Sequence, residues 1–487
     1  MILRRIGYVI CALMVIIGAV SLVFAARLKV LPSKFLVIAA VGIIAIAVLF
    51  AALQRWRIPG IITKALSLIL IVIMIIGCAY MNYTRGKVKD MTGIATKVDN
   101  IQVYVLKDDP AQNVLDAKDY SFGILRELDR KNTDEVVSEI STETGQAVNT
   151  VEQEDVFALA SALFAGDVKA IVINSAYEGF FEDSEEFADF SNRVRSIAFR
   201  DIQTKVEKKA ENDQYLKDDN TFTIYVSGVD TRGGLSGNSN SDVNILVTVN
   251  KDTHQIFLLT TPRDFYLPLS ISGGALDKLT HAGGHGVDVS KDTLADFYEV
   301  NVEDYLKINF IGFEKIVDTL GGITVWSDYS FSEVLEESAA IDIQEGWNEL
   351  NGSQALTFAR TRHTIEGGDR ARGKNQMQVI EAVLDKLLSP SILSNYAQLL
   401  DDISDCMLTS MTYDEITDLI REQLDSNASW DIQKYSVDGY DSWGSCWSAG
   451  GQELYVMEPN MDTVNKAKEY LRKMYNDEKI TVVQDTE

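Results

Sequence analysis

Residues 360–376, RTRHTIEGGDRARGKNQ, concentrate cationic side chains that could bind phosphate oxygens. The cations outnumber the acidic residues here, and they are Arg360, Arg362, Arg370, Arg372 and Lys374. The whole chain is acidic, with 45 Lys and Arg against 71 Asp and Glu and a net charge of −26. A single arginine is ordinarily a solvated surface charge, but a cluster of guanidinium groups in so acidic a chain predicts an anion site.

The order of residues in this segment indicates how the cations are presented. A glycine pair interrupts the chain, and Asp369 can cap the helix that we expect to follow. Arg372 and Gln376 are four residues apart and share one face of that helix, whose positive N-terminal end adds to the anion site. Arg360 and Arg362 are two residues apart, so they point the same way if their segment is extended.

Three apolar segments upstream are expected to collect polar side chains at one edge of a sheet. Their composition and the polar turn between the second and third predict antiparallel strands at 222–229, 243–249 and 256–261. The residues that then share one edge are Asp230, Asp242, Arg263 and Asp264. Taken without the arginines, the two strand-end aspartates Asp230 and Asp242 are explained equally well as turn residues.

The carboxylates and arginines together indicate phosphoryl transfer. Mg²⁺ takes oxygen ligands, usually one or two carboxylates with water and substrate phosphates. A pyrophosphate or phosphodiester held between such a cation and several guanidinium groups has the positioning and charge neutralisation that this chemistry needs. Other catalytic or metal-binding patterns are weak. No GxSxG-type nucleophile elbow accompanies the histidines, so Ser/His/Asp catalysis is not indicated. No Cys/His cluster suggests zinc, and the Gly-rich sequence around His281 and His285 argues against a helical metal pair.

Three uncharged apolar runs predict a membrane anchor over residues 1–84. The runs are 6–26, 35–53 and 65–83, each long enough for a helix to cross a hydrocarbon core of roughly 30 Å. The first run is too long for the apolar part of a secretion signal, and two more runs follow it. Flanking cations are nearly balanced between the two sides, so the positive-inside rule does not fix the orientation.

The rest of the chain is expected to form two α/β domains. In the first, 95–217, strands are predicted at 100–106 and 168–174 and helices at 152–165 and 182–196. It shows no cluster of chemically active residues, so we expect an accessory or spacing domain. In the second, 220–480, helix and strand signals alternate: helices at 291–300 and 311–320, strands at YLKINF and ITVW, and a helix capped by Asn351. This alternation predicts helices covering a mixed sheet.

Charge and cysteine usage bound the partners. Because nucleic acid requires a basic face, the acidity of the chain argues against such a partner. Cys406 and Cys446 lie in the soluble part. They either form a disulfide, if that part is outside the cytoplasm, or remain two free thiols.

Several motifs occur in a fixed order over residues 225–385: GVDTR, SNSDVNILVTV, TTPRDFYLPL, DKLTHAGG, IGFEKIVDTLGGITV, IQEGWNELNGSQALTFARTR and GGDRARGKNQ. In this order and spacing the chain resembles the LytR–CpsA–Psr (LCP) family of Gram-positive bacteria. The tail through YVMEPN, together with the order of three spans, accessory domain and catalytic domain, resembles the capsule-type branch of that family.

The resemblance implies an α/β/α sandwich with an apolar pocket for a polyprenyl chain, on the extracellular side of the cell membrane. It implies a Mg²⁺-dependent phosphotransferase of cell wall biogenesis. Such an enzyme moves a glycopolymer, capsular polysaccharide or teichoic acid, from an undecaprenyl pyrophosphate carrier to peptidoglycan and forms a phosphodiester. The implied partners are the carrier-linked glycopolymer, peptidoglycan and the membrane.

Roles are implied by motif position. Asp230 and Asp242 match the metal site, and either could also deprotonate the acceptor hydroxyl. The residues matched to the pyrophosphate are Arg263, Arg360, Arg362, Arg372 and Gln376, of which Arg263 and Arg362 are also implied to be catalytic. The family usually has Arg-Ser-Asp where this chain has Asn240-Ser241-Asp242. Asn240 still donates hydrogen bonds but brings no charge, for which Arg370 or Lys374 is expected to compensate.

Two other functions fit the same residues. One is a polyprenyl pyrophosphate pyrophosphatase, which would use water as the acceptor. The other is a non-catalytic protein that binds polyprenyl phosphates, and the arginine missing at Asn240 favours it. Turnover in the presence and absence of a sugar acceptor distinguishes the three functions.

Overall fold

The computed structural model describes most of the chain. The residues outside the description are 1, 92–95, 183, 185, 206–211, 219, 230–234, 236–237, 336–338, 362–363, 366–367, 390–397, 400–401, 403–405, 427 and 484–487. Two of the predicted site residues, Asp230 and Arg362, therefore lie outside the described residues.

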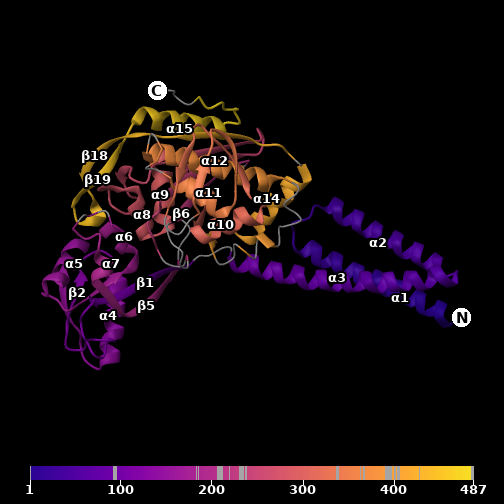
Figure 1. The fold of residues 1–487 in the computed structure, drawn as a ribbon, viewed down its shortest axis with the longest axis horizontal. Coiled ribbons are helices and arrows are strands. Elements are labelled where there is room, and N and C mark those ends of the chain that lie inside the picture. Colours follow the sequence, from indigo (N-terminus) through magenta and orange to yellow (C-terminus); the bar gives the residue numbers. More distant parts are fainter. Residues whose placement is uncertain are drawn as a thin grey trace. The chain divides into compact units, whose positions relative to one another are not determined.

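Three long apolar helices begin the chain (Figure 1). They are α1 (Ile2–Arg27), α2 (Ser33–Leu53) and α3 (Arg57–Met91). Within them the stretches Leu3–Arg27, Ser33–Leu53 and Arg57–Tyr83 are long and apolar enough to cross a membrane. Most of their large apolar side chains are exposed, which suits helices surrounded by lipid rather than water. The helices agree with the three predicted spans.

A helix from far along the chain, α14 (Tyr413–Ser426), belongs to the same compact unit as these spans. The Tyr413 hydroxyl donates to the Leu28 carbonyl at 2.7 Å, and Lys29 Nζ lies 2.7 Å from Asp414 Oδ2. The loop between α1 and α2 thus contacts a segment that follows all three spans. Three crossings would place both on the same side of a membrane, so the contact is compatible with three spans.

A five-stranded mixed sheet with the strand order β3-β2-β4-β1-β5 forms the accessory domain. Its strands are β1 (Thr96–Leu106), β2 (Ser121–Leu125), β3 (Asn149–Gln153), β4 (Ala170–Asn174) and β5 (Val194–Lys205). Its helices are α4 (Arg130–Thr144), α5 (Val156–Ala165), η1 (Ser175–Tyr177), α6 (Glu178–Glu182) and α7 (Phe190–Arg193). Alternate residues of β4 pack toward α4 and α5, so helices cover both faces.

The helix predicted at 182–196 is wrong for most of its length. Helix α6 ends at Glu182, only the short helix α7 (Phe190–Arg193) lies in the middle of the range, and the chain is extended from Val194 onward. Strand β5 pairs with β1 from Thr96↔Lys205 to Leu106↔Val194. At residues 194–196 this antiparallel pairing outweighs the local helical pattern, since the hydrogen bonds and packing of a ladder depend on a partner strand that the local sequence does not contain.

A six-stranded mixed sheet forms the centre of the catalytic domain, in the order β16-β11-β6-β7-β8-β17. Its strands are β6 (Thr221–Val229), β7 (Val243–Asn250), β8 (Gln255–Thr260), β11 (Asp304–Asn309), β16 (Met407–Thr409) and β17 (Asp431–Ser436). The predicted antiparallel arrangement of the first three strands is confirmed. Strand β11 pairs in parallel with β6, and β17 pairs in parallel with β8.

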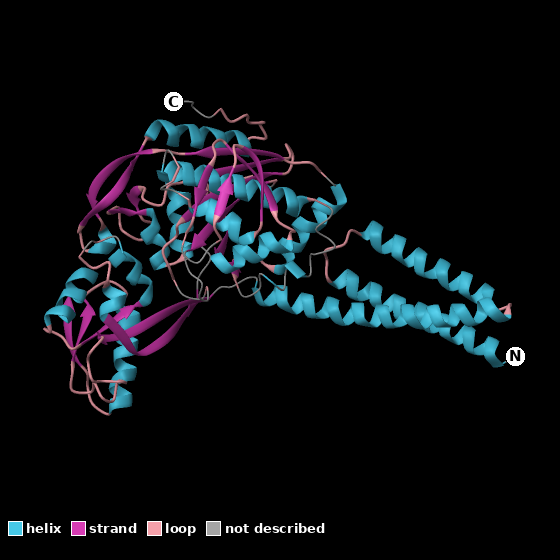
Figure 2. Ribbon diagram, viewed as in Figure 1, coloured by secondary structure: helices cyan, strands magenta, loops and turns pink. Residues whose placement is uncertain are grey.

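Helices lie on both sides of this sheet (Figure 2). On one face α9 (Val287–Tyr298) and α15 (Met461–Tyr475) pack over fully buried sheet residues such as Tyr225 and Phe257. The other face lies toward α10 (Phe310–Thr319), α11 (Gly352–Arg360) and α12 (Gly368–Leu388). Strand β6 alternates buried and partly buried residues, as expected for a sheet with one closed and one more open face. The α/β/α sandwich is confirmed.

Shorter elements complete the catalytic domain. They are β9 (Tyr266–Pro268), β10 (Leu276–Lys278), α8 (Leu279–His285), β12 (Ile323–Ser327), β13 (Phe331–Glu333), β14 (Ile341–Ile343), β15 (Gly346–Leu350), β18 (Gly439–Ser445), η3 (Trp447–Ala449) and β19 (Glu453–Pro459). Helix α8 departs from the sequence-based expectation, because Gly-rich residues 279–285 are helical and buried.

Candidate active site

A cavity of about 1050 Å³ lies beside the partly open face of the catalytic sheet. Its polar lining comes from strand ends and helix ends, and its apolar lining comes from β6, β11 and α10–α12. The predicted site residues that line it are Asn240, Asp242, Arg263, Arg360, Arg372 and Gln376. The structure therefore brings together six residues that the sequence spreads over more than a hundred positions.

Strand pairing positions the acidic side of this cavity. Gly228 near the end of β6 pairs with Val243 at the start of β7, and the Asp242 amide donates to the Gly228 carbonyl at 2.9 Å. Arg263, three residues beyond the end of β8, donates from Nη1 to Asp242 Oδ1 at 2.7 Å. The predicted meeting at one edge is confirmed for Asp242 and Arg263, while Asp230 lies outside the described residues.

A buried hydroxyl network supports the turn before β7. The Ser241 hydroxyl lies 3.0 Å from the Tyr225 hydroxyl and 2.8 Å from that of Ser227, and Tyr225 donates to Asn244 Oδ1 at 2.6 Å. Burial raises the pKa of Tyr225, although the serine hydroxyls oppose this shift. Tyr225 therefore stays a protonated donor, and the network holds the backbone on either side of Asp242.

Arg360 reaches the cavity from the last turn of α11. Asn351 caps this helix in a reciprocal capping box with Gln354, as the sequence predicts for the cap residue. The Arg360 guanidinium lies over the Phe310 ring, 4.4 Å from its centroid, which holds a long side chain in one place. Arg360 is helical, so the extended backbone on which a shared direction with Arg362 depended is not found at this residue.

Helix α12 presents Arg372 and Gln376 to the cavity from one face, as predicted. Both are about nine-tenths buried, and the Gln376 amide donates to the Ala359 carbonyl at 3.4 Å, which ties α12 to α11. Lys374 is exposed and does not line the cavity, because two residues along a helix turn the side chain by roughly 200°. Asp369 lies inside the first helical turn rather than before it.

Besides Asp230, two predicted residues stay untested. Arg370 lies in α12, but its side chain is outside the description, as is all of Arg362. Asp264, predicted at the same edge, instead turns to Lys278, whose Nζ lies 2.9 Å from Asp264 Oδ1. Both of these side chains are almost completely buried, and neither residue lines the cavity, so the ion pair is part of the packing of the domain.

The sequence predicted an apolar pocket but did not identify the residues that line it. These include Val226, Ile308, Phe313, Leu356 and Val379. Their spacing is that of ordinary core residues on strands and helices, and no local signal separates a ligand-lining apolar side chain from a core-packing one. The structure makes the distinction because Val226 and Ile308 are on the open face of the sheet.

The accessory domain supplies part of the cavity wall, although its sequence predicted only a spacer. The lining residues from this domain are Ser175, Ala176, Glu178 and Gly179. A Cβ atom at position 179 would lie 2.6 Å from Asn240 Nδ2, so the two segments touch closely. The space beside Asn240 is therefore occupied by the accessory domain.

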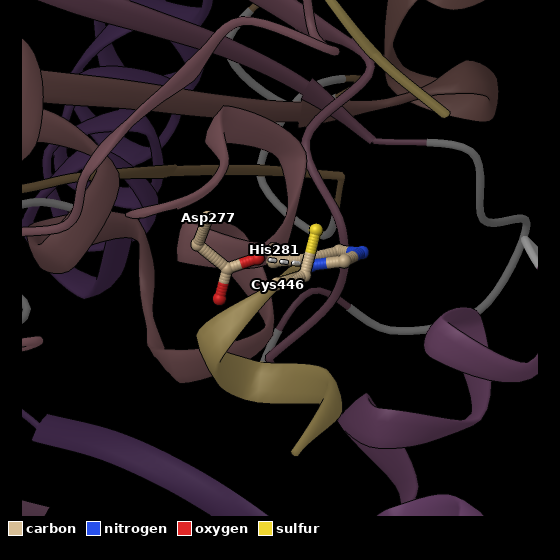
Figure 3. A group of neighbouring side chains, drawn as sticks. All are labelled: Asp277, His281 and Cys446. Atoms are coloured by element: carbon tan, nitrogen blue, oxygen red, sulfur yellow. Dashed lines mark hydrogen bonds and ion pairs between the residues drawn. The ribbon is translucent and has the colours of Figure 1, made fainter. Parts of the chain in front are cut away.

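A second polar cluster is formed by Asp277, His281 and Cys446 (Figure 3), which are not among the residues that line the cavity. The carboxylate of Asp277 accepts from His281 Nδ1 at 2.6 Å and from the Ser448 amide at 2.6 Å, and Cys446 is beside it. Burial opposes ionisation of Asp277, but His281 and Ser448 outweigh it and lower the pKa of this carboxyl. Burial raises the pKa of the Cys446 thiol. Both oxygens of Asp277 are engaged, so the cluster is a structural connection between α8 and η3.

The cysteines do not form the disulfide that the sequence left open. Cys406 and Cys446 are both buried free thiols. Cys446 belongs to the polar cluster, whereas Cys406 packs against Gly312 of α10.

Replacing Gly283 with alanine is expected to destabilise the fold and disturb the cavity. A Cβ atom there would lie 2.5 Å from the Ser239 carbonyl oxygen and 2.9 Å from the Ser241 amide nitrogen. Backbone must move to relieve such contacts, which costs about 1–3 kcal/mol, so the midpoint of thermal unfolding should fall. Gly373→Ala in α12 is the control, because its Cβ meets nothing closer than 3.5 Å and alanine favours a helix by about 0.5–1 kcal/mol. Equal midpoints for both variants would contradict this account.

Comparisons with known proteins give relatives for the catalytic part. The polyisoprenyl-teichoic acid–peptidoglycan teichoic acid transferase TagU of Bacillus licheniformis is 32% identical over 221 residues, which is 45% of this chain and 70% of TagU. Biofilm regulatory protein A of Streptococcus mutans is 30% identical over 295 residues, covering 58% of this chain and 70% of that protein. Among solved structures, protein gbs0355 from Streptococcus agalactiae aligns with a TM-score of 0.44 and 27% identity, over 55% of this chain and 91% of that chain.

The strongest of these findings concerns the family. The family model described as the LytR_cpsA_psr family matches residues 191–471. That range includes every described residue of the cavity except those from the accessory domain. By this match over more than half of its length, the chain belongs to the LytR_cpsA_psr family.

Proposed function

We propose that this chain is a phosphotransferase that moves a glycopolymer from a polyprenyl pyrophosphate carrier to peptidoglycan on the extracellular side of the cell membrane. One observation carries the proposal: a single cavity of about 1050 Å³ has both guanidinium groups and a large apolar lining. A carrier lipid has the same two parts, a pyrophosphate and a hydrocarbon chain. The transferase name of the relative TagU supports this proposal, and the polymer is of the capsular or teichoic acid type.

The residues of the cavity suit the two halves of such a donor. Arg263, Arg360 and Arg372 bind the pyrophosphate oxygens, and the Gln376 amide adds a neutral donor. Apolar residues of β11 and α10–α12 contact the polyprenyl chain. The acceptor hydroxyl attacks the phosphorus that bears the glycan, and the bond from this phosphorus to the carrier phosphate breaks. The guanidinium groups stabilise the charge that develops on the phosphoryl oxygens and on the leaving carrier phosphate.

A hard divalent cation fits the described part of the acidic edge. Asp242 lines the cavity, its side chain is 23% exposed, and only its Oδ1 is engaged by Arg263. A carboxylate oxygen of this kind suits Mg²⁺, with Asp230 as the expected second ligand. When bound, Mg²⁺ would neutralise charge on the phosphoryl oxygens.

Transfer by the purified full chain in lipid nanodiscs is the direct test. With a polyprenyl-pyrophosphate-linked disaccharide as donor and soluble peptidoglycan strands as acceptor, we expect a phosphodiester-linked product and one polyprenyl phosphate per transfer. Chelation with EDTA should lower the rate by about 10²-fold or more, and added Mg²⁺ should restore it. Release of phosphorylated sugar with the acceptor untouched would identify a pyrophosphatase instead. Donor binding without turnover would identify a non-catalytic receptor.

A further inference from the structure

Three carboxylates from described residues line the cavity, those of Glu178, Asp242 and Glu333. Asp242 is held by a cation, and Glu333 accepts hydrogen bonds from two donors. Asp242 forms the ion pair with Arg263, and Glu333 accepts from the Thr364 hydroxyl at 2.7 Å and from the Val334 amide at 3.1 Å. A cationic partner or several donors stabilise the charged form of a carboxylate and make it a weaker base.

Glu178 differs from these two in its surroundings. Among the described residues, the Tyr104 hydroxyl is the only group that donates to it, and it donates to Oε1. Burial raises the pKa of Glu178, and the bond from Tyr104 only partly opposes this shift. Burial and the charge of Glu178 also raise the pKa of Tyr104, so the phenol remains a donor. The carboxylate is thus oriented through one oxygen, and it is a stronger base than an ordinary glutamate.

Contacts between the two domains hold Glu178 at the cavity. Asp99, buried in the accessory domain, accepts from Asn174 Nδ2 at 3.1 Å, one residue before η1, and from Asn238 Nδ2 of the catalytic domain at 2.7 Å. Phe180 is two residues beyond Glu178, and the centroid of its ring lies 4.5 Å from that of the His281 ring. Fixed points therefore lie on both sides of the glutamate, as a positioned catalytic group requires.

We propose that Glu178 of the accessory domain is the general base for the acceptor, which rests on the transferase function proposed above. Its free oxygen takes the proton from the sugar hydroxyl of peptidoglycan as that hydroxyl oxygen bonds to phosphorus. The carrier phosphate leaves with the electron pair of the broken phosphorus–oxygen bond. The accessory domain thus contributes the acceptor side of the reaction, while the arginines of the catalytic domain hold the donor.

Other ionisable groups surround this glutamate. Tyr104 of β1 contacts it directly. The charged groups that share its cavity are Asp242, Arg263, Glu333, Arg360 and Arg372. The histidines of α8 pack against its neighbours, with His285 against Tyr177 and His281 against Phe180.

The test is the pH dependence of transfer by the full chain in nanodiscs, with the donor and acceptor named above. The wild-type rate should fall as the pH drops through the raised pKa of Glu178, because the base becomes protonated. Glu178→Gln should lower the turnover rate by about 10²–10⁴-fold and remove this acidic limb, with donor affinity unchanged. Tyr104→Phe should move the limb to higher pH, since the bond that lowers the pKa of Glu178 is lost.

Glu186→Gln is the matched control, because Glu186 is an exposed glutamate of the same domain outside the cavity. It should transfer at the wild-type rate. If the wild type catalyses transfer and Glu178→Gln has the same rate and pH profile, the role of Glu178 is overturned and the proposed function still stands. Absence of transfer by the wild type would overturn both. If Glu178→Gln fails to fold, an unshifted limb in Tyr104→Phe overturns the inference and a limb at higher pH supports it.

Discussion

Replacing Arg263 with alanine is expected to lower the rate of glycopolymer transfer by about 10²–10³-fold. Loss of one donor aimed at developing charge costs about 2.7–4 kcal/mol of transition-state stabilisation. Arg263 also pairs with Asp242 at 2.7 Å, so its removal leaves a carboxylate without that guanidinium where the pyrophosphate is expected to bind. We therefore expect a lower turnover rate together with weaker donor binding, measured by initial rates over a range of donor concentrations.

Two further variants test whether the loss of rate is specific to the guanidinium group of Arg263. Arg263→Lys keeps the charge but not the planar fork, so it should recover only part of the rate. Arg126→Ala removes an exposed arginine of the accessory domain, whose partners Glu152 and Glu154 are also exposed, and should leave transfer unchanged. Undiminished transfer by a folded Arg263→Ala protein would exclude the pyrophosphate role of this residue.

Replacing Asp277 with alanine is expected to cause the largest loss of stability, about 3–5 kcal/mol. The substitution leaves buried donors without their acceptor, namely His281 Nδ1, the Ser448 amide and the Lys278 amide. These donors come from segments far apart in the sequence, so β18, η3 and α8 should loosen together. Because a chain of several domains does not unfold in one step, hydrogen exchange at residues 444–449 is the suitable local measurement. Faster exchange there is expected.

The carboxylate of Asp277 also makes the stability of the folded protein depend on pH, and the direction of this dependence follows from its pKa shift. Its pKa is lowered in the folded state, so the stability it contributes is present above the ordinary aspartate pKa of about 3.9 and is lost as the pH falls below it. Protection of residues 444–449 should therefore decline on acidification in the wild type and change less in Asp277→Ala. Asp252→Ala, at an exposed aspartate of the same domain, should resemble the wild type. Equal protection in all three proteins would contradict the role of the cluster.

Much of the candidate site could be predicted from local sequence. The strands β6–β8, their antiparallel order and the meeting of Asp242 with Arg263 follow from apolar runs, a short turn and strand geometry. Arg372 and Gln376 follow from helical spacing. Arg360 lines the cavity as predicted, but the sequence left its backbone conformation open, because the extent of α11 depends on its packing and hydrogen bonds with α12.

The sequence by itself determined the three apolar spans, the α/β class and most of the cationic residues that line the cavity, since each follows from composition or from the spacing of nearby residues. Only the tertiary structure decided which apolar residues line the cavity, that His281 joins Asp277 and Cys446, and that Glu178 of the accessory domain lies in the same cavity as Arg263. The physical reason is that these features depend on contacts between segments far apart in the chain. Such contacts are set by the packing of whole sheets and helices, which leaves no periodic pattern around the residues themselves.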